Sequence, residues 1–121
     1  MHALVIEDDA IIAMLIEDEL RERGFQSVDL ASTEEEAIEA VSRTRPDLVT
    51  SDGSLNAGTG VGAVRKIRAA LVSVPVIFIT GDPDQARRCL PDAPVIEKPF
   101  SLRQLDAALR QVHPLEHPCC R

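Results

Sequence analysis

Thr50-Ser51-Asp52-Gly53-Ser54-Leu55 lies close to the middle of the chain, directly after a short apolar run. That run, Leu48-Val49, follows the helix breaker Pro46 and has the composition of a short buried strand. Gly53 lets the chain turn without a steric penalty from a Cβ atom. Asp52 is therefore predicted to stand at the carboxyl end of a strand, in a loop partly open to solvent. A lone aspartate at such a position is commonly a turn residue. Whether Asp52 has a functional role therefore depends on which side chains stand at the ends of the other strands.

The composition indicates one ordinary domain. The chain has 121 residues, of which 45% are hydrophobic, and this suffices for a single packed core. Its aromatic residues are three Phe, with no Trp or Tyr, so aliphatic side chains must build that core. A net charge of -7 argues against a nucleic-acid partner and against anionic membranes. Carboxylates gathered at one place could instead hold a divalent cation.

The sequence predicts a cytoplasmic protein with reduced thiols. No apolar run approaches the roughly 20 residues of a transmembrane helix. The N-terminus lacks the basic start and long apolar region of a signal peptide. Cys89, Cys119 and Cys120 show no metal-binding or disulfide spacing.

Short strand-like runs alternate with helical segments along the chain. This alternation predicts an α/β fold, with a parallel sheet covered by helices on both faces. One domain is predicted over residues 1–113, followed by a flexible tail over 114–121. The predicted strands are 4–6, 25–30, 48–49, 75–80 and 95–96, and the predicted helices start near residues 10, 32, 63, 84 and 101, the third after a glycine-rich loop over 56–62.

Spacing and capping signals define the individual helices. Ser32 with Glu35, and Ser101 with Gln104, have the spacing of capping boxes. The segment over 84–90 can hold only a short helix, because Pro83 and Pro91 bracket it. The first helix is predicted to present an apolar face at helical spacing, made by Ile11, Ile12, Leu15, Ile16 and Leu20.

Polar groups follow the predicted strands at the edge where a parallel sheet binds ligands. Glu7 and Asp8 follow the first strand, Asp52 the third, Thr80 ends the fourth, and Lys98 follows the fifth. Clustered carboxylates repel one another and need a cation, and Mg²⁺ prefers such oxygen ligands. A lysine and a hydroxyl facing this cation suit a phosphoryl group. Asp52 is the best placed nucleophile, because carboxylates can form aspartyl phosphates.

Together these segments resemble the signature motifs of response-regulator receiver domains. The resemblance covers about residues 3 to 112. Each motif alone is a weak signal of this family, but four of them in this order at strand ends are a strong one. It implies a doubly wound, flavodoxin-like domain with strand order 2-1-3-4-5. It also implies that Asp52 accepts a phosphoryl group from a histidine kinase or a histidine phosphotransfer protein. The motif segments are Val5-Ile6-Glu7-Asp8-Asp9, Asp47-Leu48-Val49-Thr50-Ser51-Asp52, Val76-Ile77-Phe78-Ile79-Thr80-Gly81 and Glu97-Lys98-Pro99-Phe100.

The resemblance also implies a role for each site residue. Asp8 would be the principal carboxylate for Mg²⁺, together with Asp52, and Glu7 would act mainly through water. The backbone carbonyl of Ser54 would supply another metal ligand. Lys98 would pair with the phosphoryl oxygens, and Thr80 would swing its hydroxyl toward them.

The chain departs from the family pattern in the switch region. Many receivers carry an aromatic residue three positions before the lysine, and here that position is Val95. The segment between Thr80 and Lys98 is short and proline-rich, which predicts a short or irregular fourth helix. Phe78-Ile79-Thr80-Gly81 is similar to the Phe-Ala-Thr-Gly motif of an alphaproteobacterial receiver subgroup. The chain resembles a stand-alone receiver, which would signal through contacts with a downstream protein of unknown identity.

Other functions are compatible with parts of this pattern. A Mg²⁺-dependent phosphatase of the haloacid dehalogenase type also forms an aspartyl phosphate, but it needs a second Asp where Ser54 stands. A flavodoxin-like electron carrier is disfavoured because Trp and Tyr, the usual flavin-stacking residues, are absent. A receiver can also act as a phosphate sink for a kinase rather than transmit a signal, and the sequence leaves both roles open.

Overall fold

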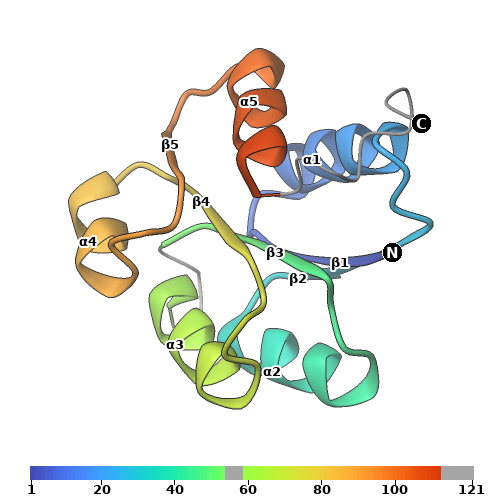
Figure 1. The fold of residues 1–121 in the computed structure, drawn as a ribbon, viewed down its shortest axis with the longest axis vertical. Helices are drawn as coiled ribbons and strands as arrows, with labels where there is room; N and C mark the ends of the chain where they lie inside the picture. Colours follow the sequence, from blue (N-terminus) through green and yellow to red (C-terminus); the bar gives the residue numbers. More distant parts are fainter. Residues whose placement is uncertain (54–58, 113–121) are drawn as a thin grey trace.

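The computed structural model describes residues 1–53 and 59–112 of the chain. It shows a five-stranded parallel sheet in the order β2-β1-β3-β4-β5, with helices on both faces, as the sequence predicts (Figure 1). Within the described residues, no helix is long and apolar enough to cross a membrane. The strands are β1 (His2–Ile6), β2 (Ser27–Ala31), β3 (Leu48–Ser51), β4 (Val76–Thr80) and β5 (Val95–Glu97), and the helices are α1 (Ala10–Glu22), α2 (Glu34–Arg43), α3 (Gly60–Ala70), α4 (Pro83–Cys89) and α5 (Leu102–Val112).

The order of the strands reverses at β1. The chain first adds β2 on one side of β1 and then returns to add β3 on the other side. Ligands bind at such a switch point, outside the carboxyl ends of the strands. Ile6 is in register with Ser51, so Glu7 and Asp52, the next residue on each strand, leave the sheet side by side.

Each face of the sheet has its own apolar core. Helices α1 and α5 cover one face, and α2, α3 and α4 cover the other (Figure 1). The strand side chains alternate between the two cores: Leu4 and Ile6 point to the α2–α4 side, and Ala3 and Val5 point to the α1–α5 side. Phe78 is the largest fully buried side chain, and the remainder of both cores is mainly aliphatic.

Helix α1 is less buried than its apolar pattern predicts. Ile16 and Leu20 are buried as expected, but Ile11 is 72% exposed and Leu15 is 47% exposed. Burial on α1 follows the single stripe Ala13, Ile16 and Leu20, because only this stripe faces the sheet. The apolar spacing thus predicts the helix, but Ile11 and Leu15 lie outside its buried stripe.

The two predicted capping boxes have different outcomes. Ser101 and Gln104 form theirs at the start of α5: Ser101 N–H donates to Gln104 Oε1 (2.8 Å), and Gln104 N–H donates to Ser101 Oγ (3.2 Å). At α2 the capping residue is Thr33 and not Ser32, so the box lies one residue later than predicted. Thr33 Oγ1 accepts from Glu36 N–H (3.0 Å), and the Glu36 carboxylate accepts from the Ser32 N–H and hydroxyl.

Helix α4 is short, as predicted. It has seven residues, its N-cap is Asp82, and Ala86 is its only buried residue. One of its first helical hydrogen bonds, from Ala86 N–H to the Asp82 carbonyl, is long at 3.4 Å. The helix is therefore anchored to the core through little buried surface.

Candidate functional site

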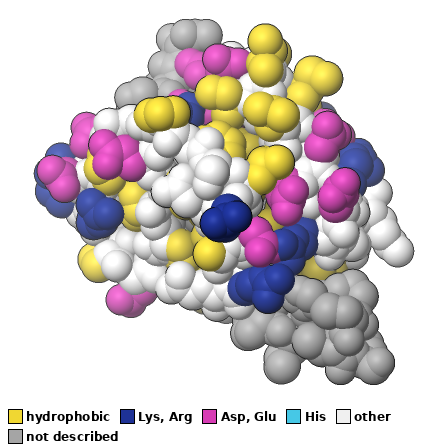
Figure 2. All heavy atoms as spheres, turned by 90° about the horizontal axis from the view of Figure 1, so that it is seen from above, with side chains coloured by type: hydrophobic (Ala, Val, Ile, Leu, Met, Phe, Trp, Pro, Cys, Tyr) yellow, Lys and Arg dark blue, Asp and Glu magenta, His cyan; other side chains and the backbone are white. Residues whose placement is uncertain are grey.

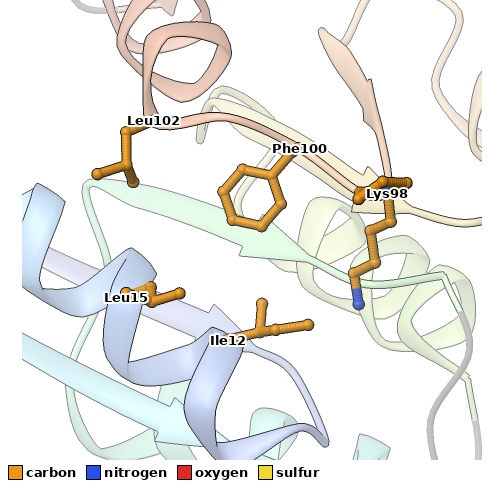
Figure 3. A pocket seen from close by; sticks show the side chains of 6 residues that line it. Ile12, Leu15, Lys98, Phe100 and Leu102 are labelled. Carbon is orange, nitrogen blue, oxygen red and sulfur yellow. The ribbon is translucent and has the colours of Figure 1, made fainter.

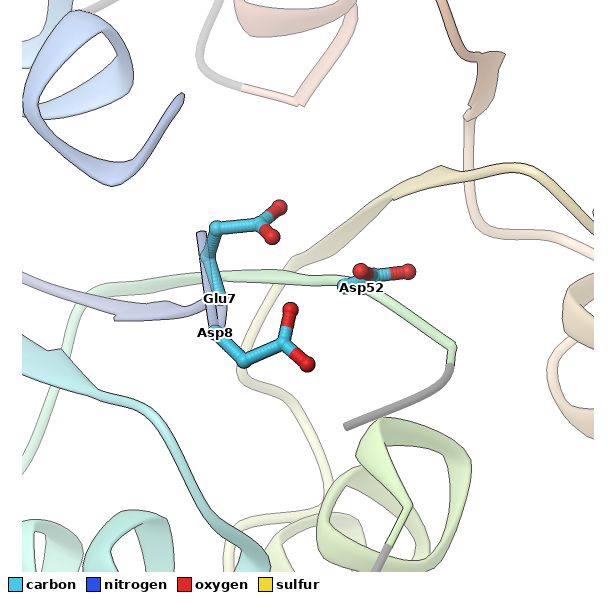
Figure 4. A group of neighbouring side chains, drawn as sticks. All are labelled: Glu7, Asp8 and Asp52. Atoms are coloured by element: carbon cyan, nitrogen blue, oxygen red, sulfur yellow. The ribbon is translucent and has the colours of Figure 1, made fainter. Parts of the chain in front are cut away.

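Three carboxylates meet at the switch point of the sheet (Figure 4). Glu7, Asp8 and Asp52 each offer one carboxylate oxygen, and these oxygens all lie within 4.8 Å of one another. Backbone hydrogen bonds continue the sheet into this cluster, since Asp52 N–H donates to the Ile6 carbonyl at 2.8 Å. Glu7 and Asp52 are buried, whereas Asp8 is half-buried and the most open of the three. The structure thus confirms that these carboxylates come together.

Lys98 reaches this cluster from the end of β5. Its Nζ donates to Glu7 Oε1 at 2.8 Å and to Asp52 Oδ2 at 3.0 Å. Lys98 N–H also donates to the Thr80 carbonyl at 2.9 Å, which fixes the start of the lysine stem beside β4. The ammonium therefore offsets the charge of two buried carboxylates at once.

Burial and hydrogen bonding have opposite effects on the pKa values of Glu7 and Lys98. Burial raises the pKa of Glu7, although hydrogen bonds from Lys98 and from the Asp9 N–H oppose the shift. Burial by itself would lower the pKa of Lys98, but the hydrogen bonds with Glu7 and Asp52 outweigh it, and the pKa of Lys98 is raised. The lysine accordingly stays charged in this site.

Thr80 lies at the end of β4 and is buried. Its Oγ1 accepts a hydrogen bond from Asp82 N–H at 3.0 Å. The side chain lies against Gly53, since a Cβ at Gly53 would be 3.0 Å from Thr80 Oγ1. The predicted switch hydroxyl is thus next to the residue that follows Asp52.

The start of α3 packs closely against the backbone of the site. A Cβ at Gly60 would overlap the carbonyl oxygen of Asp52, and Gly60 N–H donates to the Gly53 carbonyl at 3.2 Å. Ser51 Oγ also donates to the Asp52 carbonyl, at 2.9 Å. Only glycine at position 60 permits this close approach, so the backbone on both sides of Asp52 is held in place.

One predicted site position, Val95, lies outside this cluster of contacts. Val95 is in register with Phe78, is half-buried, and packs against the core under α3 and α4. Ser54 lies outside the described residues, so the metal-ligand role of its carbonyl stays a prediction.

An apolar groove opens beside the site, between α1 and the start of α5 (Figure 3). Its volume is about 450 Å³. Viewed from the side of α5, hydrophobic side chains gather on one part of the surface, with acidic side chains nearby (Figure 2). No sequence pattern predicted this groove, because helical spacing alone does not show which apolar side chains of α1 stay exposed. It is lined by Ile12, Leu15, Lys98, Pro99, Phe100 and Leu102.

The side chains at the switch point are chemically suited to Mg²⁺ and a phosphoryl group. Converging carboxylate oxygens are the ligands that Mg²⁺ prefers. The adjacent ammonium of Lys98 and hydroxyl of Thr80 can neutralise and hydrogen-bond phosphoryl oxygens.

Comparison with known proteins agrees with this geometry. The sequence profile of the response regulator receiver domain matches residues 3–110. The chain belongs to the receiver domain family. Receiver domains are signalling domains of two-component systems, and they bind Mg²⁺ at an acidic pocket.

Individual relatives of this receiver include several response regulators. The transcriptional regulatory protein PdtaR of Mycobacterium tuberculosis is 30% identical over 112 residues, which cover 89% of this chain and 54% of PdtaR. The phyllosphere-induced regulator PhyR of Methylorubrum extorquens is 35% identical over 113 residues, covering 89% of this chain and 42% of PhyR. The chain thus spans about half the length of the curated relatives it matches.

Solved structures include similar receivers. The receiver domain of Erythrobacter litoralis PhyR superposes with a TM-score of 0.83 and is 32% identical, covering 94% of this chain and 90% of that one.

One further residue at the site was not predicted from the sequence. Gln85, on the first turn of α4, directs its side chain toward Gly53, where an added Cβ would lie 3.3 Å from Gln85 Oε1. The available signal was weak: the helix that follows a site-forming strand begins close to the site. Sequence spacing alone does not show which side chain of a short helix turns toward its neighbours.

Proposed function

We propose that this receiver accepts a phosphoryl group on Asp52 from the phosphohistidine of a histidine kinase or a histidine phosphotransfer protein, and passes on the signal through protein contacts. The observation that carries the proposal is the convergence of Glu7, Asp8 and Asp52, with Lys98 Nζ 3.0 Å from Asp52 Oδ2. In this role the domain is a phosphoacceptor and not a catalyst that turns over substrates.

Phosphoryl transfer uses Asp52 as the nucleophile. An oxygen of its carboxylate attacks phosphorus, the phosphorus–nitrogen bond of the donor breaks, and the imidazole leaves with the bonding electron pair. Lys98 can then pair with the phosphoryl oxygens. Its ammonium already lies beside Asp52, so this new ion pair requires no further burial of the lysine.

Asp8 and Asp52 would hold Mg²⁺, with Glu7 acting mainly through water and the carbonyl of Ser54 completing the ligand set. When bound, the cation supplies positive charge that offsets both the carboxylate cluster and the phosphoryl oxygens. The half-buried position of Asp8 supports its role, because a metal and its water ligands need an open side.

Thr80 is the proposed reporter of phosphorylation. In the structure its hydroxyl oxygen accepts a hydrogen bond from Asp82 N–H. The same hydroxyl can donate its proton to a phosphoryl oxygen, and a shift of Thr80 would then act on the adjoining Asp82, which caps α4. The short helix α4 would respond, because little buried surface holds it.

The groove between α1 and α5 is the proposed contact surface for the phosphoryl donor. A protein that delivers a phosphoryl group to Asp52 must contact the rim of the site, and Lys98 belongs to both the site and the groove. Exposed apolar side chains line the groove: Leu15 and Leu102 are both 47% exposed. Such a patch is typical of protein interaction surfaces.

The test of the function is phosphorylation of Asp52→Asn by acetyl phosphate or by a histidine kinase. We expect the variant to lose acid-stable, hydroxylamine-labile labelling, because the amide cannot form an aspartyl phosphate. Asp84→Asn removes the same charge from the exposed surface of α4 and serves as the control. Undiminished labelling of Asp52→Asn would refute the assignment of the site.

The competing phosphatase function makes a different prediction. A haloacid dehalogenase type enzyme needs a general acid at the position of Ser54. We therefore expect no catalytic release of phosphate from p-nitrophenyl phosphate, and multiple turnovers would favour the phosphatase.

A further inference from the structure

The side chains of Gln85 and Thr80 both lie against Gly53, the residue that follows Asp52. A Cβ atom at Gly53 would lie 3.0 Å from Thr80 Oγ1 and 3.3 Å from Gln85 Oε1. These two polar groups come from different elements, the end of β4 and the first turn of α4. The carboxamide of Gln85 therefore stands at the rim of the proposed phosphorylation site.

The side chain of Gln85 has no hydrogen-bond partner among residues 1–53 and 59–112. Its backbone N–H donates to Asp82 Oδ1 at 3.2 Å, but its carboxamide makes no comparable bond within this part of the chain. The amide atoms of Gln85 are not fully buried, so a water or ligand can reach them. An amide can both donate and accept, so this group is available for a water or ligand at the rim.

Several of the other polar groups near Asp52 already have partners, whereas the carboxylate of Asp8 takes no part in the Lys98 contacts among the described residues. The Lys98 ammonium donates to Glu7 and Asp52, and Thr80 Oγ1 accepts from the Asp82 N–H. The carboxylate of Asp82 accepts from the Gln85 N–H in capping α4. Gln85 is thus a neutral side chain at this rim that can orient a further molecule without adding charge.

We propose that Gln85 hydrogen-bonds the water that hydrolyses phosphorylated Asp52, and so limits the lifetime of the phosphoryl group. The inference rests on the proposed phosphorylation of Asp52. In the reaction the water oxygen bonds to phosphorus while the bond from phosphorus to the Asp52 oxygen breaks, and its electron pair returns to the carboxylate. A proton of the water passes to the departing phosphate or to solvent, which leaves Asp52 and inorganic phosphate. A carboxamide that accepts from the water holds one lone pair toward phosphorus, which is the positioning role that glutamine fulfils in other phosphoryl hydrolysis sites.

The matched test variant is Gln85→Met. Methionine preserves the length and approximate shape of the side chain but lacks the amide, so hydrogen bonding is removed with little change in packing. Arg88→Ala alters an exposed residue of the same helix and serves as the control. Each protein is labelled with radioactive acetyl phosphate in Mg²⁺, separated from the donor, and followed for loss of label. We expect the half-life of the label to lengthen roughly tenfold in Gln85→Met and to stay unchanged in Arg88→Ala.

A second measurement separates water positioning from a structural effect. Thermal unfolding with and without Mg²⁺ should be the same for Gln85→Met and the parent protein, because the side chain is assigned no part in metal binding. An unchanged or shortened half-life in Gln85→Met overturns the inference while leaving the phosphorylation site intact. A lengthened half-life accompanied by a changed response to Mg²⁺ also overturns it, since the effect then passes through the metal site. If the parent protein takes no label from any donor, both the proposed function and this inference fail.

Discussion

Lys98 neutralises two buried carboxylates, and this arrangement has a consequence for the unphosphorylated domain. Buried charges are tolerated when they are paired and hydrogen-bonded, and Lys98 provides this for Glu7 and Asp52. Asp8 has no share in these lysine contacts among the described residues and is the most open of the three acids. An incoming cation can therefore use Asp8 without first breaking an ion pair.

Asp8→Asn should weaken Mg²⁺ binding at least tenfold, because it removes a charged ligand from a site that few protein groups complete. Isothermal titration of the purified protein with Mg²⁺ measures this. Asp9→Asn is the matched control: it removes a charge one residue away, but Asp9 caps α1 through the Ile11 and Ile12 N–H groups, and asparagine caps equally well. Equal Mg²⁺ affinity in Asp8→Asn and the parent would place the metal site elsewhere.

Thr50 offers a test of a buried polar group near the site. It lies on β3, is 1% exposed, and its hydroxyl has no hydrogen-bond partner in the described part of the chain. Thr50→Val keeps the shape and removes the unsatisfied hydroxyl, so the free energy of unfolding should rise by about 1 kcal/mol. Thr50→Ser retains the hydroxyl and loses a methyl group, so it should lower the same quantity by about 1 kcal/mol. Urea denaturation measures both, and a destabilised Thr50→Val would show that the hydroxyl is satisfied in solution.

At the scale of elements, the helices differ in how firmly they are held. Helix α5 buries Leu105, Ala108 and Leu109 against the sheet, whereas α4 buries only Ala86. Isolated helices shorter than about 12 residues are marginal in water, so α4 depends on its caps and on this contact. The opening of α4 is therefore expected to cost less free energy than the opening of the other helices.

Amide hydrogen exchange tests whether α4 responds to phosphorylation. Residues 82–93 should exchange fast in the free protein and slow down when Mg²⁺ and beryllofluoride, a phosphoryl mimic, are added. The physical reason is that Thr80 would leave the Asp82 N–H for the phosphoryl group and so reposition the N-cap of α4. Helix α2, which contributes no residue to the site, should show little change. High protection of residues 82–93 in the free protein, or no change with the mimic, would contradict this switch.

At the scale of the whole molecule, the site and the groove share one end of the domain. The carboxyl ends of the strands carry the acids and Lys98, and α1 and α5 enclose the adjoining apolar groove. The net charge of -7 opposes self-association, whereas an exposed apolar patch favours contact with other proteins. A donor protein could thus bind apolar surface while its phosphohistidine enters the site.

Leu15→Glu should reduce phosphotransfer from a histidine kinase or phosphotransfer protein at least tenfold, because it places a charge in the apolar contact surface. Labelling by acetyl phosphate, which needs no docking surface, should stay unchanged. Val72→Glu is the matched control, since Val72 is also an exposed aliphatic residue (73%) but lies after α3, away from the groove. The cognate donor is first found by profiling phosphotransfer against the kinases of the source organism. Equal transfer rates for Leu15→Glu and Val72→Glu would exclude the groove as the contact surface.

The sequence by itself determined the order of the elements and the chemistry of the strand ends. Apolar runs such as Val76-Ile77-Phe78-Ile79 predict buried strands from local composition, and parallel topology then requires Glu7, Asp52 and Lys98 to meet at one edge. The short α4 also followed from local rules, because Pro83 and Pro91 limit a helix wherever it packs.

The tertiary structure decided which side chains are covered and which small groups touch. Helical spacing places Ile11 and Leu15 among other apolar residues, but only packing against the sheet determines which stripe of α1 is buried. The contacts of Lys98 with two carboxylates, and the approach of Gln85 to Gly53, join residues far apart in the chain. Periodicity reports the environment of one element, whereas these contacts depend on how several elements are placed in space.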